Sequence, residues 1–224
     1  MTDSPQAAPT RQLLLRRAAF FTVFALVVAG IIGVTLYLIY RSSFLPRHDA
    51  AAVAPNVTVK ALVSFPDDRT FPDGLALAPG GTLYLTLFGT GAIDKIDSTG
   101  KLTPFITDKS RIVSPGAILV APDNMIYVLD YTLSEQAVGT LKKITPDGAV
   151  STWGSFGTDQ VTLFGALALD AAENLYVTTG DRQVWRFSPD GKGVVWWTAA
   201  PVDNAAPQTT GIAYDAGHNA MIIG

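Results

Sequence analysis

The side chains that could do chemistry in this 224-residue chain are mainly carboxylates and hydroxyls. There is no cysteine, which excludes disulfides, thiolate nucleophiles and cysteine-based metal sites. The two histidines, His48 and His218, have no further metal-binding residue at a useful spacing. The sequence also lacks the Gly-x-Ser-x-Gly elbow that presents a hydrolase serine. The oxygen donors remain, and their meaning depends on the elements that hold them.

A repeated pattern organises most of the chain: a glycine, alternating apolar residues, a polar turn and an apolar strand. It occurs as GLALAPGGTLYLT (74–86), GAILVAPDNMIYVLD (116–130), GALALDAAENLYVTT (165–179) and GIAYDAGHNAMIIG (211–224). The leading glycines are spaced by 42, 49 and 46 residues. The first three copies continue with a strand and a tight turn, IDKIDSTGK (93–101), LKKITPDGA (141–149) and VWRFSPDGK (184–192), and then a further β-rich segment.

Each unit therefore holds four short strands in about 45 residues, the size of a β-propeller blade. An antiparallel sandwich is the alternative, and the fixed spacing of glycine, turn and tyrosine favours the propeller. We expect an all-β domain over residues 57–224, with a closing strand at 57–65 and blades that open at Gly74, Gly116, Gly165 and Gly211. Because Gly224 falls within a fourth blade, we expect the domain to be a fragment of a longer propeller.

Residues 18–40 contain no charged side chain. As a helix they would be roughly 34 Å long, enough to cross a hydrocarbon core of ~30 Å. A secretory signal peptide is the alternative, but its apolar stretch is usually shorter, about 7–15 residues. We expect an uncleaved signal-anchor over 18–40, a cytoplasmic segment 1–17 and a stalk 41–56.

Charge indicates orientation and partners. Three arginines precede the apolar segment (Arg11, Arg16 and Arg17) and two follow it closely (Arg41 and Arg47). This excess predicts a plasma or inner membrane protein with its C-terminal domain outside the cytoplasm. From residue 57 onward there are 11 Lys and Arg against 17 Asp and Glu. An acidic domain is a poor nucleic-acid binder. The expected partners are the membrane and a small-molecule or protein ligand.

The segment FPDGLALAPGGTLYLTLFGTGAIDKIDSTGKLTPFI (71–106) resembles blades of the senescence marker protein/gluconolactonase family and of the related NHL-repeat and strictosidine synthase-like propellers. The resemblance extends over residues 57–224 and is strongest in the three complete repeats. It implies a six-bladed domain when complete. Several members of these families hold a divalent cation, commonly calcium, at the central channel, so the resemblance also implies a possible calcium site.

In the lactonase branch, the resemblance places the metal and substrate ligands just before the glycine that opens each innermost strand. Those side chains converge on the channel axis, where they could form an oxygen cage for a hard cation. Asp73 fits this pattern as a calcium ligand. Pro115 and Phe164 cannot bind a metal, and Thr210 is a weak neutral ligand.

Further polar residues could line the same channel. Thr86, Asp130 and Thr178 lie at the ends of the tyrosine-containing strands. Each candidate also has a structural interpretation, because Pro-Asp-Gly around Asp73 is an ordinary turn sequence and Asp130 precedes a loop.

Two functions follow from these observations. The first is an anchored propeller that binds a small molecule or a protein. The second is a calcium-dependent lactonase or esterase, implied by the resemblance and by Asp73. The shortage of ligands before the other glycines favours the binding role. Propellers host many activities, so the fold alone does not choose between the two.

Overall fold

The computed structural model describes residues 11–42, 54–65, 69–132, 138–156, 165–179, 182–201 and 208–224. The chain divides into two units, Met1–Ala61 and Leu62–Gly224, which are considered separately. His48, Phe164 and most of the predicted cytoplasmic and stalk segments lie outside the described residues.

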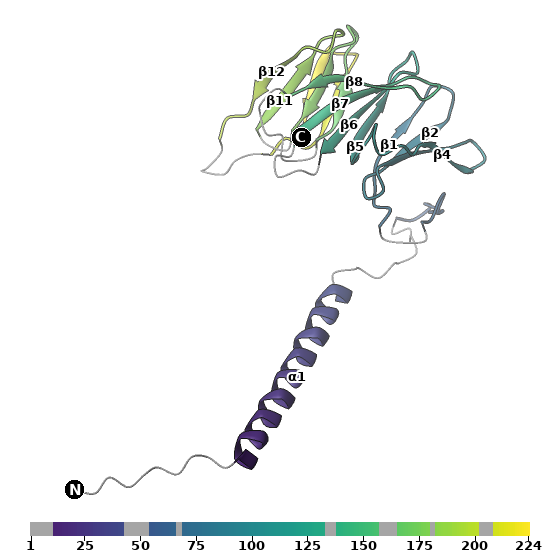
Figure 1. Cartoon of the computed structure of the whole chain (residues 1–224). Helices are drawn as coiled ribbons and strands as arrows, with labels where there is room; N and C mark the ends of the chain where they lie inside the picture. The colour runs from purple at the N-terminus through teal and green to yellow at the C-terminus, as the bar shows by residue number, and fades with distance from the viewer. Residues whose placement is uncertain are drawn as a thin grey trace, which may run out of the picture. The chain divides into compact units, whose positions relative to one another are not determined.

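The first unit contains one helix, α1 (Arg11–Ser42), drawn in purple in Figure 1. Its stretch Arg16–Tyr40 is long and apolar enough to cross a membrane, and none of it is buried within the protein. The helix extends beyond the predicted 18–40 at both ends because arginine, glutamine and leucine are good helix formers. Length and composition suit a membrane span, and a signal sequence would share both properties.

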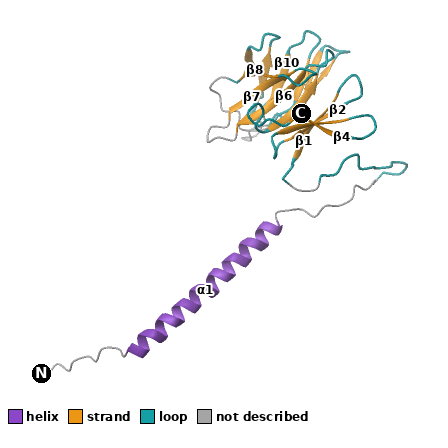
Figure 2. Cartoon of the chain, turned by 45° about the vertical axis from the view of Figure 1, so that its right-hand side comes forward, coloured by secondary structure: helices purple, strands orange, loops and turns teal. Residues whose placement is uncertain are grey.

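The second unit consists of antiparallel sheets, shown in orange in Figure 2. Repeat 1 contains β1 (Pro72–Leu77), β2 (Leu83–Leu87), β3 (Ala92–Ile96) and β4 (Leu102–Ile106). Repeat 2 contains β5 (Pro115–Val120), β6 (Ile126–Thr132), β7 (Val138–Ile144) and β8 (Val150–Ser155). Repeat 3 contains β9 (Leu167–Leu169), β10 (Leu175–Thr178), β11 (Gln183–Phe187) and β12 (Gly193–Thr198). Repeat 4 contains β13 (Ile212–Asp215) and β14 (Ala220–Ile223).

Within each repeat the strands pair in chain order, and the turn residues explain this order. In the predicted Pro-Asp-Gly turns, Gly148 and Gly191 adopt positive φ angles of 96° and 83°. Only glycine adopts this conformation without a steric penalty, so these turns reverse the chain between the third and fourth strands.

The hydrophobic core lies between successive sheets. One buried cluster joins repeats 1 and 2 and includes Tyr84, Ile93, Ile118 and Val128. A second joins repeats 2 and 3 through the residues Tyr127, Leu129, Phe156, Leu175, Val177 and Phe187. Period-two alternation gives each inner strand two apolar faces, one for each neighbouring sheet. The repeated tyrosines therefore hold adjacent sheets together.

A cation lies opposite each of these tyrosines on the third strand. Tyr84 pairs with Lys95, Tyr127 with Lys143 and Tyr176 with Arg186. The Lys95 ammonium lies 3.7 Å from the centroid of the Phe105 ring, and burial lowers the pKa of Lys95. Cation–aromatic contact thus adds to the stability of the sheet.

Residues 57–65, predicted as a closing strand, form neither helix nor strand in the structure. A strand is held by hydrogen bonds to a neighbouring strand. Within the described residues, none of the strand pairs includes this segment. The segment therefore does not form the predicted strand in this structure.

Candidate functional site

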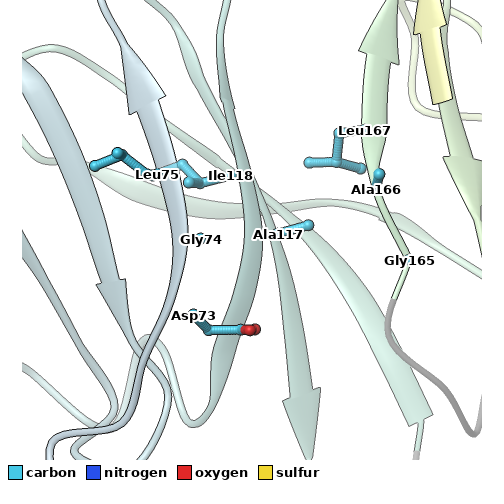
Figure 3. A pocket seen from close by; sticks show the side chains of 8 residues that line it. All are labelled: Asp73, Gly74, Leu75, Ala117, Ile118, Gly165, Ala166 and Leu167. Carbon is cyan, nitrogen blue, oxygen red and sulfur yellow. The ribbon is translucent and has the colours of Figure 1, made fainter. Parts of the chain in front are cut away.

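The first strands of three successive repeats border one cavity. β1 contacts β5, and β5 contacts β9. The cavity has a volume of about 270 Å³ and is lined by Asp73, Gly74, Leu75, Ala117, Ile118, Gly165, Ala166 and Leu167 (Figure 3). Among the described residues that line the cavity, Asp73 is the one ionisable residue. Pockets for drug-sized molecules are typically about 300–1,000 Å³, so this volume suits a small ligand.

A β-bulge places Asp73 at this cavity. Pro72 pairs with Leu87, and Leu75 pairs with Leu85, so β1 has one residue more than β2 across this interval. A bulge bends its strand and redirects the side chains within it. Figure 3 shows the Asp73 carboxylate extending away from β1. It reaches β5, where its Oδ2 lies close to the backbone of Gly116.

The Asp73 carboxylate has no hydrogen bond or ion pair with any residue that the structure describes. The side chain is exposed at the cavity surface, and partial burial by the surrounding wall raises its pKa above the ordinary value of 3.8. Desolvation of a carboxylate disfavours its charged form unless a partner compensates. The site therefore favours a ligand that supplies positive charge or hydrogen-bond donors.

Gly116 makes room for this carboxylate. A Cβ at position 116 would lie 3.0 Å from Asp73 Oδ2 and 2.9 Å from Tyr131 Cε2. Burial raises the pKa of the Tyr131 phenol, and the charge of Asp73 raises it further. Asp73, Gly116 and Tyr131 consequently form one packed group built from β1, β5 and β6. Tyr131 is not predictable as a site residue from the sequence, because nothing in the pattern around it distinguishes it from a core aromatic.

Thr86 and Thr178, predicted as possible channel-lining residues, are fully buried behind the inner strands. The Thr86 hydroxyl accepts a hydrogen bond from the Gly74 N–H (2.7 Å) and donates one to the Gly116 carbonyl (2.7 Å). The Thr178 hydroxyl accepts from the Ala166 N–H (2.8 Å) and donates to the Thr210 carbonyl (3.3 Å). Both hydroxyls are occupied by backbone groups, so they join neighbouring repeats and do not line the cavity.

Asp130 is also buried, with 2% of its surface exposed. Its Oδ1 accepts hydrogen bonds from the N–H groups of Val113 (3.0 Å) and Ser114 (2.9 Å). Burial raises the pKa of Asp130, and these two bonds together with the charge of Lys142 partly offset the increase. Asp130 therefore holds the segment that enters β5, a structural role at the strand end.

The strand register changes the comparison between repeats. The tyrosines of the second strands pair with equivalent positions of the first strands: Tyr84 with Ala76, Tyr127 with Leu119 and Tyr176 with Ala168. By this register, the counterparts of Asp73 are Gly116, Gly165 and Thr210, in place of Pro115, Phe164 and Thr210. Thr210 is exposed, and its N–H donates to the Gly224 carbonyl (2.9 Å). Asp73 remains the one carboxylate in this set.

The described residues do not fit a calcium site. Calcium takes about six to eight oxygen ligands, usually with several carboxylates. The described wall of the cavity provides one carboxylate. Across the described parts of the chain, no group of three or more His, Cys, Asp or Glu residues could hold a metal ion. The donor set matches a singly charged partner better than a divalent cation.

Comparison with known proteins identifies the fold. No family model and no curated protein matches the chain. Virginiamycin B lyase from Staphylococcus aureus matches with a TM-score of 0.55 and 15% identity, over 71% of this chain and 50% of the lyase. A gluconolactonase from Xanthomonas campestris matches with a TM-score of 0.53 and 21% identity, over 69% of this chain and 56% of that chain.

The described repeats form a partial β-propeller. Gluconolactonase-like proteins are among its structural neighbours, as the sequence resemblance predicted. At these identities the likeness concerns the fold alone. The chain spans about half the length of the solved structures that it matches. Repeats 1 to 3 each have the four paired strands of a blade, and in repeat 4 β13 pairs with β14.

Proposed function

We propose that this chain is a membrane-anchored propeller that lies outside the cytoplasm and binds a ligand in the cavity beside Asp73. The observation that carries the proposal is the composition of the cavity wall. One carboxylate without a partner among the described residues faces a space bordered by glycine, alanine, leucine and isoleucine. Small-molecule sites commonly combine an apolar wall with a few polar groups that fix the ligand.

The anchor supports the proposed location. α1 contains an apolar stretch that is long enough to span a bilayer, with Arg16 and Arg17 at its N-terminal end. A positive N-terminal flank favours retention of that end in the cytoplasm. The propeller would then face the extracytoplasmic side, where its cavity could meet a solute or a polypeptide.

A calcium-dependent lactonase or esterase is the second candidate. The position of Asp73 in the cavity favours it, together with the fold shared with a gluconolactonase. The described cavity does not contain a donor set that fits calcium. For this reason we assign no hydrolytic step to the described residues, and the binding role is preferred.

Two measurements on the full chain in lipid nanodiscs test the choice. The first follows hydrolysis of glucono-δ-lactone by proton release, with calcium at millimolar concentration. We expect wild type, Asp73→Ala and a protein-free sample to give the same rate. The second follows the methyl NMR signals of Leu75, Ile118 and Leu167 during addition of propylammonium, propionate and 1-propanol.

The proposal predicts a saturable shift of these methyl signals with at least one compound. It is contradicted if none of them moves the signals, or if lactone turnover disappears in Asp73→Ala. Glu173→Gln serves as the matched control, because it removes an exposed carboxylate from a turn outside this cavity.

A further inference from the structure

We infer that the ligand of this cavity carries a single ammonium or guanidinium group, held by Asp73, on a compact apolar body. This inference rests on the proposed binding function and specifies its ligand class. It follows from three properties of the described wall: its charge, the free space around the carboxylate and the apolar surface beside it.

The first property is charge. Asp73 is the one ionisable residue in the wall, and its carboxylate has no hydrogen bond or ion pair with a described residue. A monovalent cation would neutralise that charge completely. A divalent cation would retain excess charge and would lack most of its oxygen ligands. An anion would face the carboxylate with no compensating donor from a basic side chain.

The second property is access. The bulge in β1 directs the Asp73 side chain toward Gly116 on β5. A Cβ added at Gly116 would lie 3.0 Å from Asp73 Oδ2. Because position 116 is a glycine, the carboxylate fits against β5, and the Asp73 side chain is exposed toward the cavity that it lines. Ionised carboxylates accept at both oxygens, so they can receive an ammonium or, in bidentate fashion, a guanidinium. The neighbouring hydroxyl of Thr86 does not compete, because it already donates to the Gly116 carbonyl.

The third property is the apolar wall. Leu75 lines the cavity with 60% of its surface exposed, and Ala117, Ile118 and Leu167 are partly exposed or buried beside it. Covering such surface releases water and is favourable by roughly 25 cal/mol per Å². A short alkyl or small cyclic body attached to the cation would cover Leu75. The volume of about 270 Å³ limits that body to a few carbon atoms.

A charge-matched series tests the inference on the full chain in nanodiscs. Propylammonium and ethylguanidinium are titrated against the methyl signals of Leu75, Ile118 and Leu167, with 1-propanol as the neutral analogue and calcium chloride as the divalent probe. Glu173→Gln should bind each of the two cations with the same affinity as wild type. Asp73→Asn, which keeps the shape and removes the charge, should bind them about tenfold more weakly or worse.

Each contrary result has a separate meaning. Equal binding of 1-propanol and propylammonium, or unchanged cation affinity in Asp73→Asn, overturns the inference and leaves a neutral-ligand site. Stronger binding of calcium than of either cation, lost in Asp73→Asn, also overturns it. If Asp73-dependent lactone turnover accompanies that calcium binding, the proposed binding function fails as well.

Discussion

Thr86 donates a hydrogen bond of 2.7 Å to the carbonyl of Gly116, across the boundary between the first and second blades. Thr178 repeats the arrangement between the third and fourth blades by donating to the carbonyl of Thr210 at 3.3 Å. Each hydroxyl also accepts a hydrogen bond from a backbone N–H of its own blade, that of Gly74 for Thr86 and that of Ala166 for Thr178. A buried threonine at the end of the second strand is therefore a connection between blades, placed directly behind the cavity.

Replacing Thr86 with valine tests this connection. Thr86→Val keeps the shape but leaves the Gly74 N–H and the Gly116 carbonyl without the hydroxyl, and the unfolding free energy should fall by about 1–3 kcal/mol. Thermal unfolding of the full chain in nanodiscs should show a Tm lower by several degrees. Thr103→Val is the control, because Thr103 is half-exposed on β4. An equal or larger fall for Thr103→Val would contradict the role of Thr86.

Gly116→Ala tests the close approach of the carboxylate. The added methyl would lie 3.0 Å from Asp73 Oδ2 and 2.9 Å from Tyr131 Cε2, so the carboxylate or the ring must move. We expect cation binding in the NMR titration to weaken by about tenfold, since a charge-assisted hydrogen bond loses its geometry. Gly80→Ala is the control, because a Cβ there meets nothing within 4 Å. Unchanged binding in Gly116→Ala would exclude this packing.

The blade pattern was predictable because turns and strands depend on local residue types. The Gly-containing turns and the tyrosines at 84, 127 and 176 repeat at nearly constant spacing, and repeats 1 to 3 each form the expected four strands. Trp196 and Trp197 are half-exposed on β12, and Trp196 packs against Tyr176 with ring centroids 5.0 Å apart. The residue types within each repeat were therefore sufficient to predict the strands of each sheet.

The site was less predictable because it depends on a bulge. Both β1 and β5 carry one extra residue opposite their second strands. In β1 the glycine follows Asp73, whereas in β5 the glycine itself occupies the position equivalent to Asp73. Alignment on glycines therefore shifted the comparison by one residue. A one-residue shift reverses the face of a strand, which also explains why Asp130 and Thr86 differ in their surroundings.

The pH dependence of binding should follow Asp73. Its pKa is raised by burial, so the ionised form that holds a cation is lost at a higher pH than for an ordinary aspartate. For the same reason, Asp73 favours the folded state when protonated, and that contribution is lost as the pH rises from about 3.8 through its folded pKa. Cation affinity should fall as the pH drops through the same range.

Carboxyl carbon NMR measures this directly, with Asp190 as an internal reference. Hydrogen bonds from Lys192 and Ser188 lower the pKa of Asp190 to about 2. We expect the Asp73 midpoint above 3.8 and the Asp190 midpoint near 2. Tyr131, the ionisable neighbour whose pKa Asp73 influences, stays protonated throughout. An Asp73 midpoint below 3.8 would mean that the carboxylate has a partner that stabilises its charge.

Membrane attachment through α1 predicts two results in cells. The full-length chain should stay with the membrane after extraction with alkaline carbonate, because the stretch Arg16–Tyr40 is long and apolar enough to cross the bilayer. Protease added outside intact cells should degrade the propeller. Release of a shorter chain that lacks α1 would instead identify the helix as a cleaved signal sequence. Protection of the propeller in intact cells would contradict the proposed orientation.

The central claim is that Asp73 binds a cationic ligand and does not support hydrolysis. The most direct test compares Asp73→Asn with wild type in two assays, the propylammonium titration and the lactone assay with calcium. Both proteins are prepared in the same type of nanodisc. We predict that Asp73→Asn lowers the propylammonium affinity by about tenfold or more and leaves the hydrolysis rate at the protein-free level, as in wild type. Lactone hydrolysis that requires Asp73, with propylammonium affinity unchanged, would contradict the account.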